Sequence, residues 1–499
     1  MIHGKPPPTG SVQLNLIDFL EFTAGCQQSE ESFKMPGNAH PKICVLGLDC
    51  AAPDIVFGDP RLKNLHRLMS MGTWGRLESV IPPITVPAWM CMATSQDPGS
   101  LGVYGFRNRA DRTYRGLSFV DSRSIIQPAI WDHLATYGKR SIVMGLPPGY
   151  PPSPIAGIRI GCFLTPDPAK TEFTYPAEIS SEIRSLVGDY AVDVPGFRTD
   201  DKAWLREQIF EMSRKHWKVV RWLLAEKEWD YFHYVDIGLD RVHHGFWDSF
   251  DPKHIHYKPG NPYENVIPDY YLWLDEQIGA VLDTLDGQAV VLVVSDHGAQ
   301  RLDGGFAVNE WLAREGLLVV DEMPKEITPF AKVKVNWART KVWSEGGYYA
   351  RVFLNVHGRE PRGVIPATQY ESFRDDMKRR LEGLSDPQGR PLDSLVFKPE
   401  QIYRYVRNVA PDLIVHFGGL YWRSIGSMGH GHLHVEENDT GPDACNHAQF
   451  GTFILYAPGL DLRGECHGAH LLDVSPTLLD LAGYDIPPAM QGRSLRTRS

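Results

Sequence analysis

The sequence predicts an α/β fold in which a mostly parallel central sheet is flanked by helices. The first observation is a set of short, continuously apolar runs of strand length. Continuous runs are typical of strands that are buried on both faces of a largely parallel sheet. The second observation is that helix-like segments lie between the runs, which is the element order of an α/β sandwich. The runs are Lys42–Leu48, Ser141–Gly145, Tyr231–Val235, Ala289–Val294, Leu413–Phe417 and Thr452–Tyr456.

Helical spacing of apolar residues is clearest in two of the intervening segments. Asp201–Lys227 carries apolar residues such as Trp204, Ile209 and Trp217 at helical spacing, and Ile267–Leu285 shows the same pattern. A pattern of this length predicts an amphipathic helix that covers one face of a sheet.

The domain organisation follows from where these patterns are present and where they are missing. Residues 1–38 are predicted to be a poorly ordered N-terminal extension, and residues 39–499 to form one domain. The stretches 102–200 and 304–411 fit the core pattern poorly, and the first is rich in Pro and Gly. We interpret both as insertions that form a cap over a site.

Composition limits the classes of function. The 499 residues are 42% apolar and 22% charged, as in soluble globular proteins. A net charge of -10 and a pI near 6.0 argue against a nucleic-acid polymer as partner. An anionic substrate would need a local positive centre, which a bound metal supplies. No apolar run approaches the roughly 18–20 residues of a membrane span.

The cysteines point to a reducing compartment. They are odd in number, scattered, and include no CxxC pair. This pattern predicts reduced thiols and a cytoplasmic location, with neither a disulfide framework nor a cysteine zinc site. The seven positions are 26, 44, 50, 91, 162, 445 and 466.

Acidic and histidine residues follow three of the apolar runs. In open α/β sheets, ligands bind outside the carboxyl ends of the strands. A single Asp after a strand is usually a turn or cap residue, but three strands that each deliver such side chains to one edge predict a metal site. The residues in this position are Asp49, Asp236, Asp240, His244, Asp296 and His297.

The spacing of Asp240 and His244 supports the metal-site prediction. At i and i+4 on a helix, the two side chains lie on the same face, about 5–6 Å apart at Cβ. Zinc accepts imidazole nitrogen and carboxylate oxygen. The neighbouring His243 has i+3 spacing and ranks behind His244 as a candidate, with a helix-surface position as the simpler interpretation.

A hydroxyl nucleophile is predicted at Thr85. Prolines 82, 83 and 87 fix the chain around it, and Val86–Ala93 can continue as a helix. Thr85 would then lie at a helix N-terminus, where backbone N–H groups and the dipole favour an anion. A hydroxyl beside a divalent metal can attack phosphorus. The alternative is that Thr85 only caps the helix.

These motifs, in this order, resemble the alkaline phosphatase superfamily. The most similar group is the type I phosphodiesterase/nucleotide pyrophosphatases, including their predicted phosphohydrolases and phosphomutases. The resemblance extends from about Lys42 to Leu495. The motifs that carry it are Gly47-Leu48-Asp49, Pro82–Trp89, Asp240-x-x-x-His244, Ser295–Gly298 and Asn446-His447-x-x-x-Gly451.

The resemblance implies an alkaline phosphatase-like catalytic domain with two divalent metal ions. Asp240, His244 and His447 would hold one ion. Asp49, Thr85, Asp296 and His297 would hold the other, with Thr85 as nucleophile. Zinc suits these ligands, and manganese is the alternative. The expected partner is a small-molecule phosphoester, which is cleaved through a phosphothreonine.

The sequence departs from the family pattern after the nucleophile segment. Nucleotide pyrophosphatases place a phosphate-binding asparagine there, but its register falls near Phe106 in this chain. Arg107 and Asn108 are therefore the candidate substrate-binding residues. Thr-Val-Pro-Ala-Trp replaces the Cys/Ser-x-Pro-x-Arg motif of sulfatases, which disfavours sulfatase activity.

Three functions remain open at this point. The first is a phosphodiesterase or pyrophosphatase. It is favoured because many aromatic rings, among them Trp337 and Tyr348, are available to contact the second organic group of a diester. The second is a phosphomutase, phosphotransferase or phosphomonoesterase on the same site. The third is an inactive, metal-stabilised binding scaffold, which the intact Thr85 disfavours. The cluster His430, His432 and His434 is predicted to lie on a mobile loop, with a third metal site as the alternative.

Overall fold

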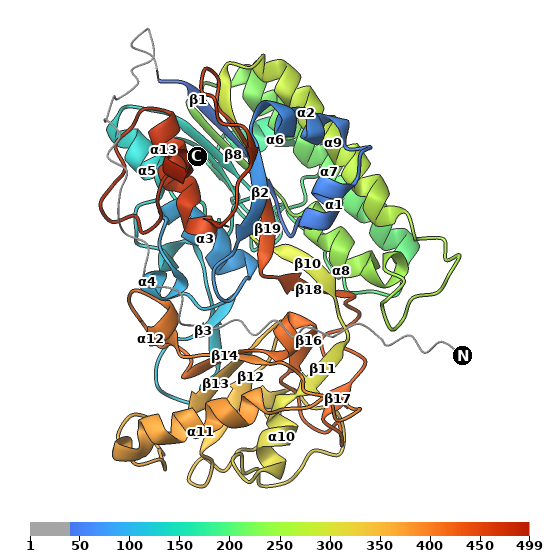
Figure 1. Ribbon diagram of the computed structural model, residues 1–499, viewed down its shortest axis with the longest axis vertical. Coiled ribbons are helices and arrows are strands. Elements are labelled where there is room, and N and C mark those ends of the chain that lie inside the picture. Colours follow the sequence, from blue (N-terminus) through green and yellow to red (C-terminus); the bar gives the residue numbers. More distant parts are fainter. Residues whose placement is uncertain (1–39, 499) are drawn as a thin grey trace, which may run out of the picture. The chain divides into compact units, whose positions relative to one another are not determined.

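The structure, a computed structural model, describes residues 40–498 (Figure 1). The predicted extension 1–38 lies outside the described residues. No helix among residues 40–498 is long and apolar enough to cross a membrane.

Within this part of the chain, the central sheet contains ten strands in the order β20-β2-β19-β9-β1-β8-β5-β6-β7, with β21 paired to β2. The inner pairs β9/β1, β1/β8, β8/β5 and β5/β6 are parallel. The sheet is therefore mostly parallel at its centre, as predicted. The strands are β1 Lys42–Leu48, β2 Thr73–Glu78, β5 Ser141–Met144, β6 Gly157–Ile160, β7 Thr174–Tyr175, β8 Tyr231–Asp236, β9 Ala289–Val294, β19 Phe450–Tyr456, β20 Gly464–Glu465 and β21 Ala469–His470.

The outer strands run in the opposite direction. β19, which the run Thr452–Tyr456 predicted as a strand, is antiparallel to both β9 and β2. At the other side of the sheet, β7 is antiparallel to β6. Part of the segment 102–200 thus builds the central sheet through β5, β6 and β7.

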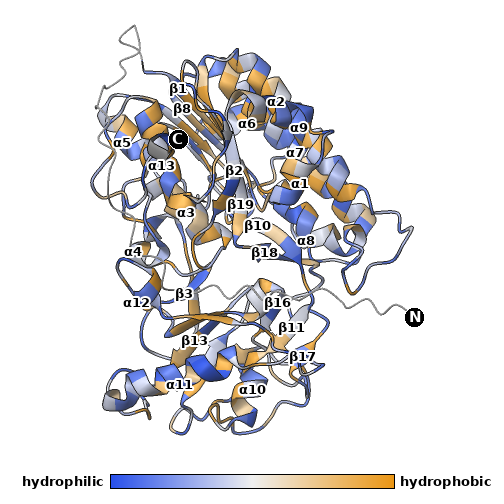
Figure 2. Ribbon diagram, in the orientation of Figure 1, coloured by the Kyte–Doolittle hydropathy of each residue, from blue (hydrophilic) through white to orange (hydrophobic). Residues whose placement is uncertain are grey.

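Helices cover both faces of the sheet (Figure 1). Along β1, Cys44, Leu46 and Leu48 pack into one core, and Ile43 and Val45 pack into the other. This division explains why the run is apolar throughout. In Figure 2 the covering helices carry apolar and polar stripes. On the first face lie α1 Pro53–Gly58, α2 Lys63–Met71, α6 Ile179–Val187, α7 Lys202–Glu226, α8 Gly238–Phe250 and α9 Val266–Leu285; on the second lie α3 Thr85–Thr94, α4 Pro98–Leu101, α5 Ile130–Thr136 and α13 Val474–Leu481.

A second lobe is built around the antiparallel sheet β12-β13-β15-β14 and the small sheet β16-β11-β17. The run Leu413–Phe417 belongs here and not to the central sheet, because Leu413, Val415 and Phe417 pack into the core of this lobe. The elements of the lobe are β11 Gly304–Ala307, α10 Val308–Arg314, β12 Val342–Glu345, β13 Ala350–Leu354, α11 Tyr370–Glu382, β14 Leu395–Phe397, α12 Pro399–Ile402, β15 Leu413–His416, β16 Trp422–Ile425 and β17 His434–Val435.

Two short strand pairs and a small apolar cluster join the lobe to the central sheet. β10 Gly298–Arg301 pairs with β18 Cys445–Ala448, and β3 Arg107–Arg109 pairs with β4 Leu117–Phe119. The cluster brings Ile84, just before α3, against Tyr349 and Ile414 of the second lobe. The start of α3 is therefore enclosed between the two parts of the fold.

Candidate metal centre

Three adjacent strands end at one edge of the central sheet, and each is followed by metal-ligand side chains. β9, β1 and β8 are neighbours and run parallel. Asp49 directly follows β1, and Asp296 and His297 follow β9 after one residue. Asp240 lies in the first turn of α8, which begins shortly after β8. The fold therefore brings these side chains to one place.

Asp49, Asp296, His297 and Thr85 form what we name the Thr85 cluster. Ligand atoms of Asp49, Asp296 and His297 all lie within 4.8 Å of one another. Nε2 of His297 is 3.2 Å from Oδ2 of Asp296 and 3.7 Å from Oδ1 of Asp49. The hydroxyl oxygen of Thr85 is 3.2 Å from the same nitrogen. The hydroxyl thus faces the centre of a potential metal site.

Thr85 is the first residue of α3, and the extended Ile84 occupies the N-cap position. The first helical hydrogen bond runs from the Ala88 amide to the Ile84 carbonyl, at 3.0 Å. No side chain caps this helix, so the hydroxyl of Thr85 is not used as a cap. It is buried at the helix N-terminus, where the peptide dipoles favour negative charge.

The Asp240 cluster consists of Asp240, His244 and His447. Nε2 of His244 is 3.2 Å from Oδ1 of Asp240, and Nε2 of His447 is 4.0 Å from the same oxygen. His447 reaches this position on β18, where it pairs with Ala299 of β10. The ring of His447 also stacks on that of His297, with centroids 3.9 Å apart. The two clusters are therefore in contact.

The outward-facing atoms of the ligands are held by other parts of the protein. Such contacts orient metal ligands and fix the histidine tautomer. The guanidinium of Arg241 also donates to Oδ2 of Asp240. The other contacts are Trp89 Nε1 to Asp49 Oδ2 (2.8 Å), the Cys50 amide to Asp296 Oδ1 (3.4 Å), His297 Nδ1 with the Gly298 carbonyl (3.1 Å), His447 Nδ1 with the Pro83 carbonyl (2.9 Å) and His244 Nδ1 with Asp443 Oδ1 (2.6 Å).

Several inward-facing atoms are buried and form no hydrogen bond within residues 40–498. They are Asp49 Oδ1, Asp296 Oδ2, Asp240 Oδ1 and His244 Nε2. A buried polar atom without a hydrogen bond is costly unless another partner satisfies it. Carboxylate oxygens and imidazole nitrogens that converge in this way fit divalent ions at both clusters.

Protonation equilibria are consistent with this fit. Burial, and then the charge of Asp240, raise the pKa of Asp49 well above its usual range. Burial, and then the charge of Asp49, likewise raise the pKa of Asp296 well above its usual range. Burial lowers the pKa of His297 to about 4 and that of His447 well below its ordinary value. The rings of His297 and His447 are therefore neutral, as ligation requires, and the crowded carboxylates call for added positive charge.

Comparison with known proteins places the chain in a family. A family model described as type I phosphodiesterase/nucleotide pyrophosphatase matches residues 43–443. The chain belongs to this family. It is accordingly a hydrolase, and the family implies divalent metal ions, for which the ligand groups above are present. A comparison with the curated proteins finds no match.

Solved structures of similar fold cover nearly the whole chain. Phosphonoacetate hydrolase from Sinorhizobium meliloti 1021, in complex with phosphonoformate, is 16% identical with a TM-score of 0.55, covering 89% of this chain and 96% of that one. An inactive murine ectonucleotide pyrophosphatase/phosphodiesterase 5, in complex with AMP, is 13% identical with a TM-score of 0.51, covering 90% and 96%. These matches show that this member of the family shares the α/β fold of both enzymes.

The second lobe contributes contacts that sequence reasoning had not assigned. The ring of Tyr348 stacks on His447, with centroids 4.3 Å apart and planes at 30°. Its hydroxyl is 3.3 Å from Oδ2 of Asp443. Arg423 of the same lobe and Arg198, which precedes α7, also bind Asp443, at 2.6 and 3.2 Å. Sequence reasoning named Tyr348 only among many aromatic rings, and no local signal marks Asp443.

Asp443 polarises His244. Burial opposes a charged ring, but the carboxylate of Asp443 raises the pKa of His244 well above its ordinary value. Burial likewise opposes ionisation of Asp240, and yet His244 and Arg241 hold its pKa well below the usual range. Asp443 therefore orients the imidazole of His244 and makes it more basic.

The candidate substrate residues lie on β3. Arg107 is exposed, and its carbonyl accepts a hydrogen bond from Arg351. The side-chain oxygen of Asn108 accepts a hydrogen bond from the backbone amide of Tyr104, and its side-chain nitrogen donates one to the Gly105 carbonyl, both at 2.8 Å. Asn108 thus holds its own loop together, and the exposed guanidinium of Arg107 lies over the ring of Phe119, 5.7 Å from its centroid.

Two further strand-end candidates have structural roles. Asp236 accepts hydrogen bonds from Trp217 (2.7 Å) and Tyr270 (2.8 Å), so its carboxylate is already satisfied. His243 is buried beside the rings of Trp247 and Tyr271, which places it in the core and not on the helix surface.

The histidine cluster of the 426–443 segment is separate from these ligands. The hydroxyl of Ser427 lies 2.9 Å from His430 Nε2 and 2.7 Å from Asp439 Oδ2. His434 contacts the Ser385 carbonyl at 2.9 Å. Among residues 40–498, the groups of three potential metal ligands do not include His430, His432 or His434.

Proposed function

We propose that this chain is a two-metal phosphohydrolase that cleaves phosphodiester or pyrophosphate bonds through a phosphothreonine at Thr85. One observation carries the proposal. The buried hydroxyl of Thr85, at the first residue of α3, lies 3.2 Å from Nε2 of His297 and faces carboxylates whose inward oxygens form no hydrogen bond.

The Thr85 cluster would hold one divalent ion and the Asp240 cluster the other. When bound, the ions would act as Lewis acids on the phosphoryl oxygens and favour the alkoxide of Thr85. Zinc suits these nitrogen and oxygen ligands, and manganese is the alternative. Two ions bring +4 and the three carboxylates bring -3, so the site is close to neutral once Thr85 is ionised.

The reaction divides into two displacements. In the first, the hydroxyl of Thr85 releases its proton to solvent and its oxygen forms a bond to phosphorus, while the bond to the leaving oxygen breaks with its electron pair. The leaving group then takes a proton from solvent. In the second, water attacks the phosphothreonine, which releases a phosphomonoester and restores the hydroxyl. The N-terminus of α3 stabilises negative charge at Thr85 throughout.

The arginines next to the Asp240 cluster support a diester over a monoester. Enzymes that bind the second charge of a monoester typically use a free guanidinium fork. Here Arg241 donates to Asp240, and Arg198 and Arg423 are both bound to Asp443. Each of these cations is already paired with a carboxylate. Arg107, exposed on β3, and Asn108 remain our candidates for substrate contacts.

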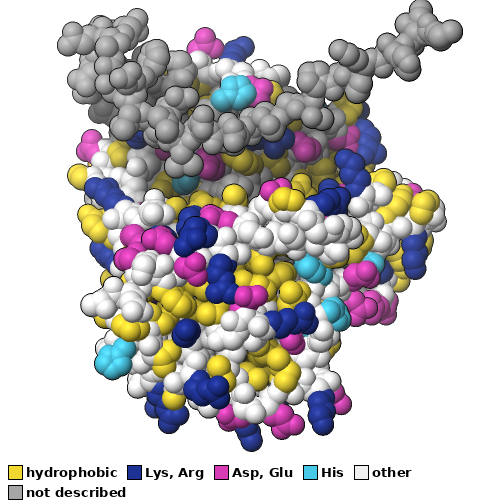
Figure 3. Space-filling view, turned by 60° about the horizontal axis from the view of Figure 1, so that its bottom comes forward, with side chains coloured by type: hydrophobic (Ala, Val, Ile, Leu, Met, Phe, Trp, Pro, Cys, Tyr) yellow, Lys and Arg dark blue, Asp and Glu magenta, His cyan; other side chains and the backbone are white. Residues whose placement is uncertain are grey.

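The surface supports a small-molecule substrate. On the face shown in Figure 3, basic and acidic side chains are interspersed over the second lobe. A nucleic-acid polymer is usually bound by clustered positive charge, and the net charge of the chain is -10.

The decisive experiment compares kcat/KM for bis(p-nitrophenyl) phosphate and p-nitrophenyl phosphate at equal zinc loading. We expect the diester to be preferred. A tenfold preference for the monoester, about 1.4 kcal/mol in transition-state stabilisation, would overturn the substrate assignment. Acid quenching during turnover, followed by mass spectrometry, should recover a phosphorylated peptide containing Thr85. Addition of alcohol acceptors tests for phosphotransfer, because a transferase would form the new ester.

A further inference from the structure

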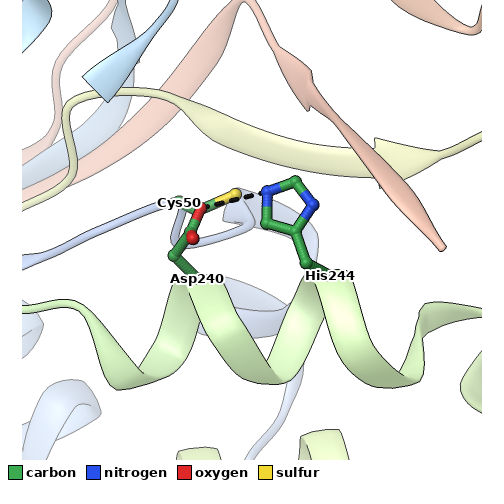
Figure 4. A group of neighbouring side chains, drawn as sticks. All are labelled: Cys50, Asp240 and His244. Atoms are coloured by element: carbon green, nitrogen blue, oxygen red, sulfur yellow. Dashed lines mark ion pairs between the residues drawn. The ribbon is translucent and has the colours of Figure 1, made fainter. Parts of the chain in front are cut away.

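Cys50 lies at the Asp240 cluster although the family ligand set does not include it. Its sulfur, an oxygen of Asp240 and a nitrogen of His244 all lie within 4.8 Å of one another. Figure 4 shows the sulfur beside the contact between Asp240 and His244. Cys50 is fully buried, and Oδ1 of Asp240 and Nε2 of His244 form no hydrogen bond. Three donor atoms of metal-ligand type therefore converge.

The backbone holds Cys50 in an uncommon conformation. Its φ is 68°, a left-handed value that a residue with a side chain adopts rarely. The turn is fixed because the Cys50 amide donates to Asp296 Oδ1 at 3.4 Å and the Ala51 amide donates to Ser295 Oγ at 2.8 Å. Glycine would fit this turn more easily, so an unfavourable position that carries a buried thiol points to a role for the sulfur.

The thiol of Cys50 also lies 3.4 Å from the Gly298 carbonyl and interacts with the side chain of Cys445. Resting on the two-metal function above, we propose that Cys50 is a thiolate ligand of the ion held by Asp240, His244 and His447. On binding, the thiol releases its proton to solvent and the sulfur forms a bond to the ion. A bound cation is known to deprotonate a coordinating thiol.

The thiolate determines which metal the Asp240 cluster prefers. Sulfur ligands select zinc, whereas oxygen ligands suit manganese and magnesium. It also completes the charge balance. The ion at this cluster meets one carboxylate and one thiolate, and the ion at the Thr85 cluster meets the carboxylates of Asp49 and Asp296. Each half is neutral before Thr85 ionises, so the thiolate adds one negative charge to the count of the three carboxylates given above.

Cys445 provides a matched control. Its sulfur lies 3.4 Å from Nδ1 of His244, on the side of the ring that Asp443 already holds at 2.6 Å. The carboxylate of Asp443 is in turn neutralised by Arg198 and Arg423. We therefore expect Cys445 not to be a ligand of the ion at Nε2 of His244, although it is as buried as Cys50 and interacts with the Cys50 side chain.

The test uses spectroscopy in addition to activity. The purified full chain is stripped with a chelator and titrated with cobalt, and thiolate-to-cobalt charge transfer is followed in the near ultraviolet. We expect the band in the wild type and in Cys445→Ser and its loss in Cys50→Ser. Zinc affinity of Cys50→Ser should fall by at least about tenfold, with manganese affinity changed less. X-ray absorption of the zinc-loaded wild type, which needs no variant, should show sulfur at about 2.3 Å.

The outcomes separate the two proposals. Two bound ions, turnover of the diester and no sulfur at zinc would overturn the role of Cys50 and leave the two-metal function intact. A band that persists in Cys50→Ser would also overturn it. Failure of the wild type to bind either metal would overturn both.

Discussion

The hydroxyl oxygen of Thr85 lies 3.2 Å from Nε2 of His297, although 212 residues separate the two in the chain. The other ring nitrogen of His297 contacts the Gly298 carbonyl at 3.1 Å. The ring is therefore fixed, and the nitrogen that faces Thr85 is the one available to a metal. This relationship joins the proposed nucleophile to the proposed metal site and gives the first prediction.

Thr85→Ala should lower kcat by at least about a thousandfold, or ~4 kcal/mol, because the attacking oxygen is missing. Metal content should change little, since the Asp and His ligands remain. Thr85→Ser, which keeps the hydroxyl, should retain part of the activity. The measurement is steady-state hydrolysis of the diester with elemental analysis of the same samples. Wild-type turnover in the alanine variant would disprove the nucleophile assignment.

Chelation should abolish hydrolysis, and zinc or manganese should restore it. His447→Ala should weaken binding at the Asp240 cluster selectively, because it removes one of the ligands there. His434→Ala is the control, since His434 contacts the Ser385 carbonyl and no metal ligand. Isothermal titration with zinc of metal-stripped protein measures the zinc affinity of both variants. Full activity in a demonstrably metal-free preparation would contradict the two-metal proposal.

Asp443→Asn should reduce zinc affinity or activity by about 10- to 100-fold, because the carboxylate no longer fixes and polarises His244. The fold should persist, since the asparagine keeps the size of the side chain. The control is Asp439→Asn on the same segment, where the carboxylate contacts Ser427 at 2.7 Å. Equal effects of the two substitutions on zinc affinity would indicate that Asp443 only holds the 426–443 segment in place and does not act through His244.

Arg107→Ala should raise KM for the diester with little effect on stability, because the Arg107 side chain is exposed. Asn108→Ala should instead lower the melting temperature, because it leaves the Tyr104 amide and the Gly105 carbonyl without their partner. Steady-state kinetics and thermal unfolding of both variants separate the two effects. A KM unchanged in Arg107→Ala would remove Arg107 from the substrate site.

Acidification should destabilise the metal-free protein through buried histidines outside the metal ligands. Burial lowers the pKa of His416 to about 3, below the ordinary value near 6.5. Its contribution to stability is therefore complete above pH 6.5 and is lost as the pH falls toward 3. At pH 5 the loss is about 2 kcal/mol. The free energy of unfolding, measured with urea, should differ less between pH 7 and pH 5 in His416→Phe than in the wild type. The phenylalanine ring can pack beside Phe397 as the imidazole does.

The sequence determined the central strands and the residues at their ends. A run such as Lys42–Leu48 is apolar throughout because both faces of β1 are buried, and an acidic residue after such a run has to lie at the sheet edge. The i, i+4 spacing placed Asp240 and His244 on one face of α8. These relationships are local, so the sequence carries them directly.

The partner of a buried strand is not local, and here sequence reasoning fell short. Continuous apolarity reports burial on both faces, but it says nothing about which sheet a strand joins. Leu413–Phe417 is buried on both faces inside the core of the second lobe, and Thr452–Tyr456 is buried on both faces as an antiparallel strand of the central sheet. Both runs were strands, and their neighbours were decided by packing.

Only the tertiary structure brought Cys50, Tyr348 and Asp443 to the proposed metal ligands. Their contacts with His244 and His447 join segments about 100 to 200 residues apart. The scattered cysteines predicted no cysteine zinc site, and a lone sulfur leaves no spacing pattern to find. Such contacts depend on how the β10/β18 pair and the second lobe close over the strand ends. Local patterns encode where a chain turns, whereas only the packed core fixes which distant side chains share one site.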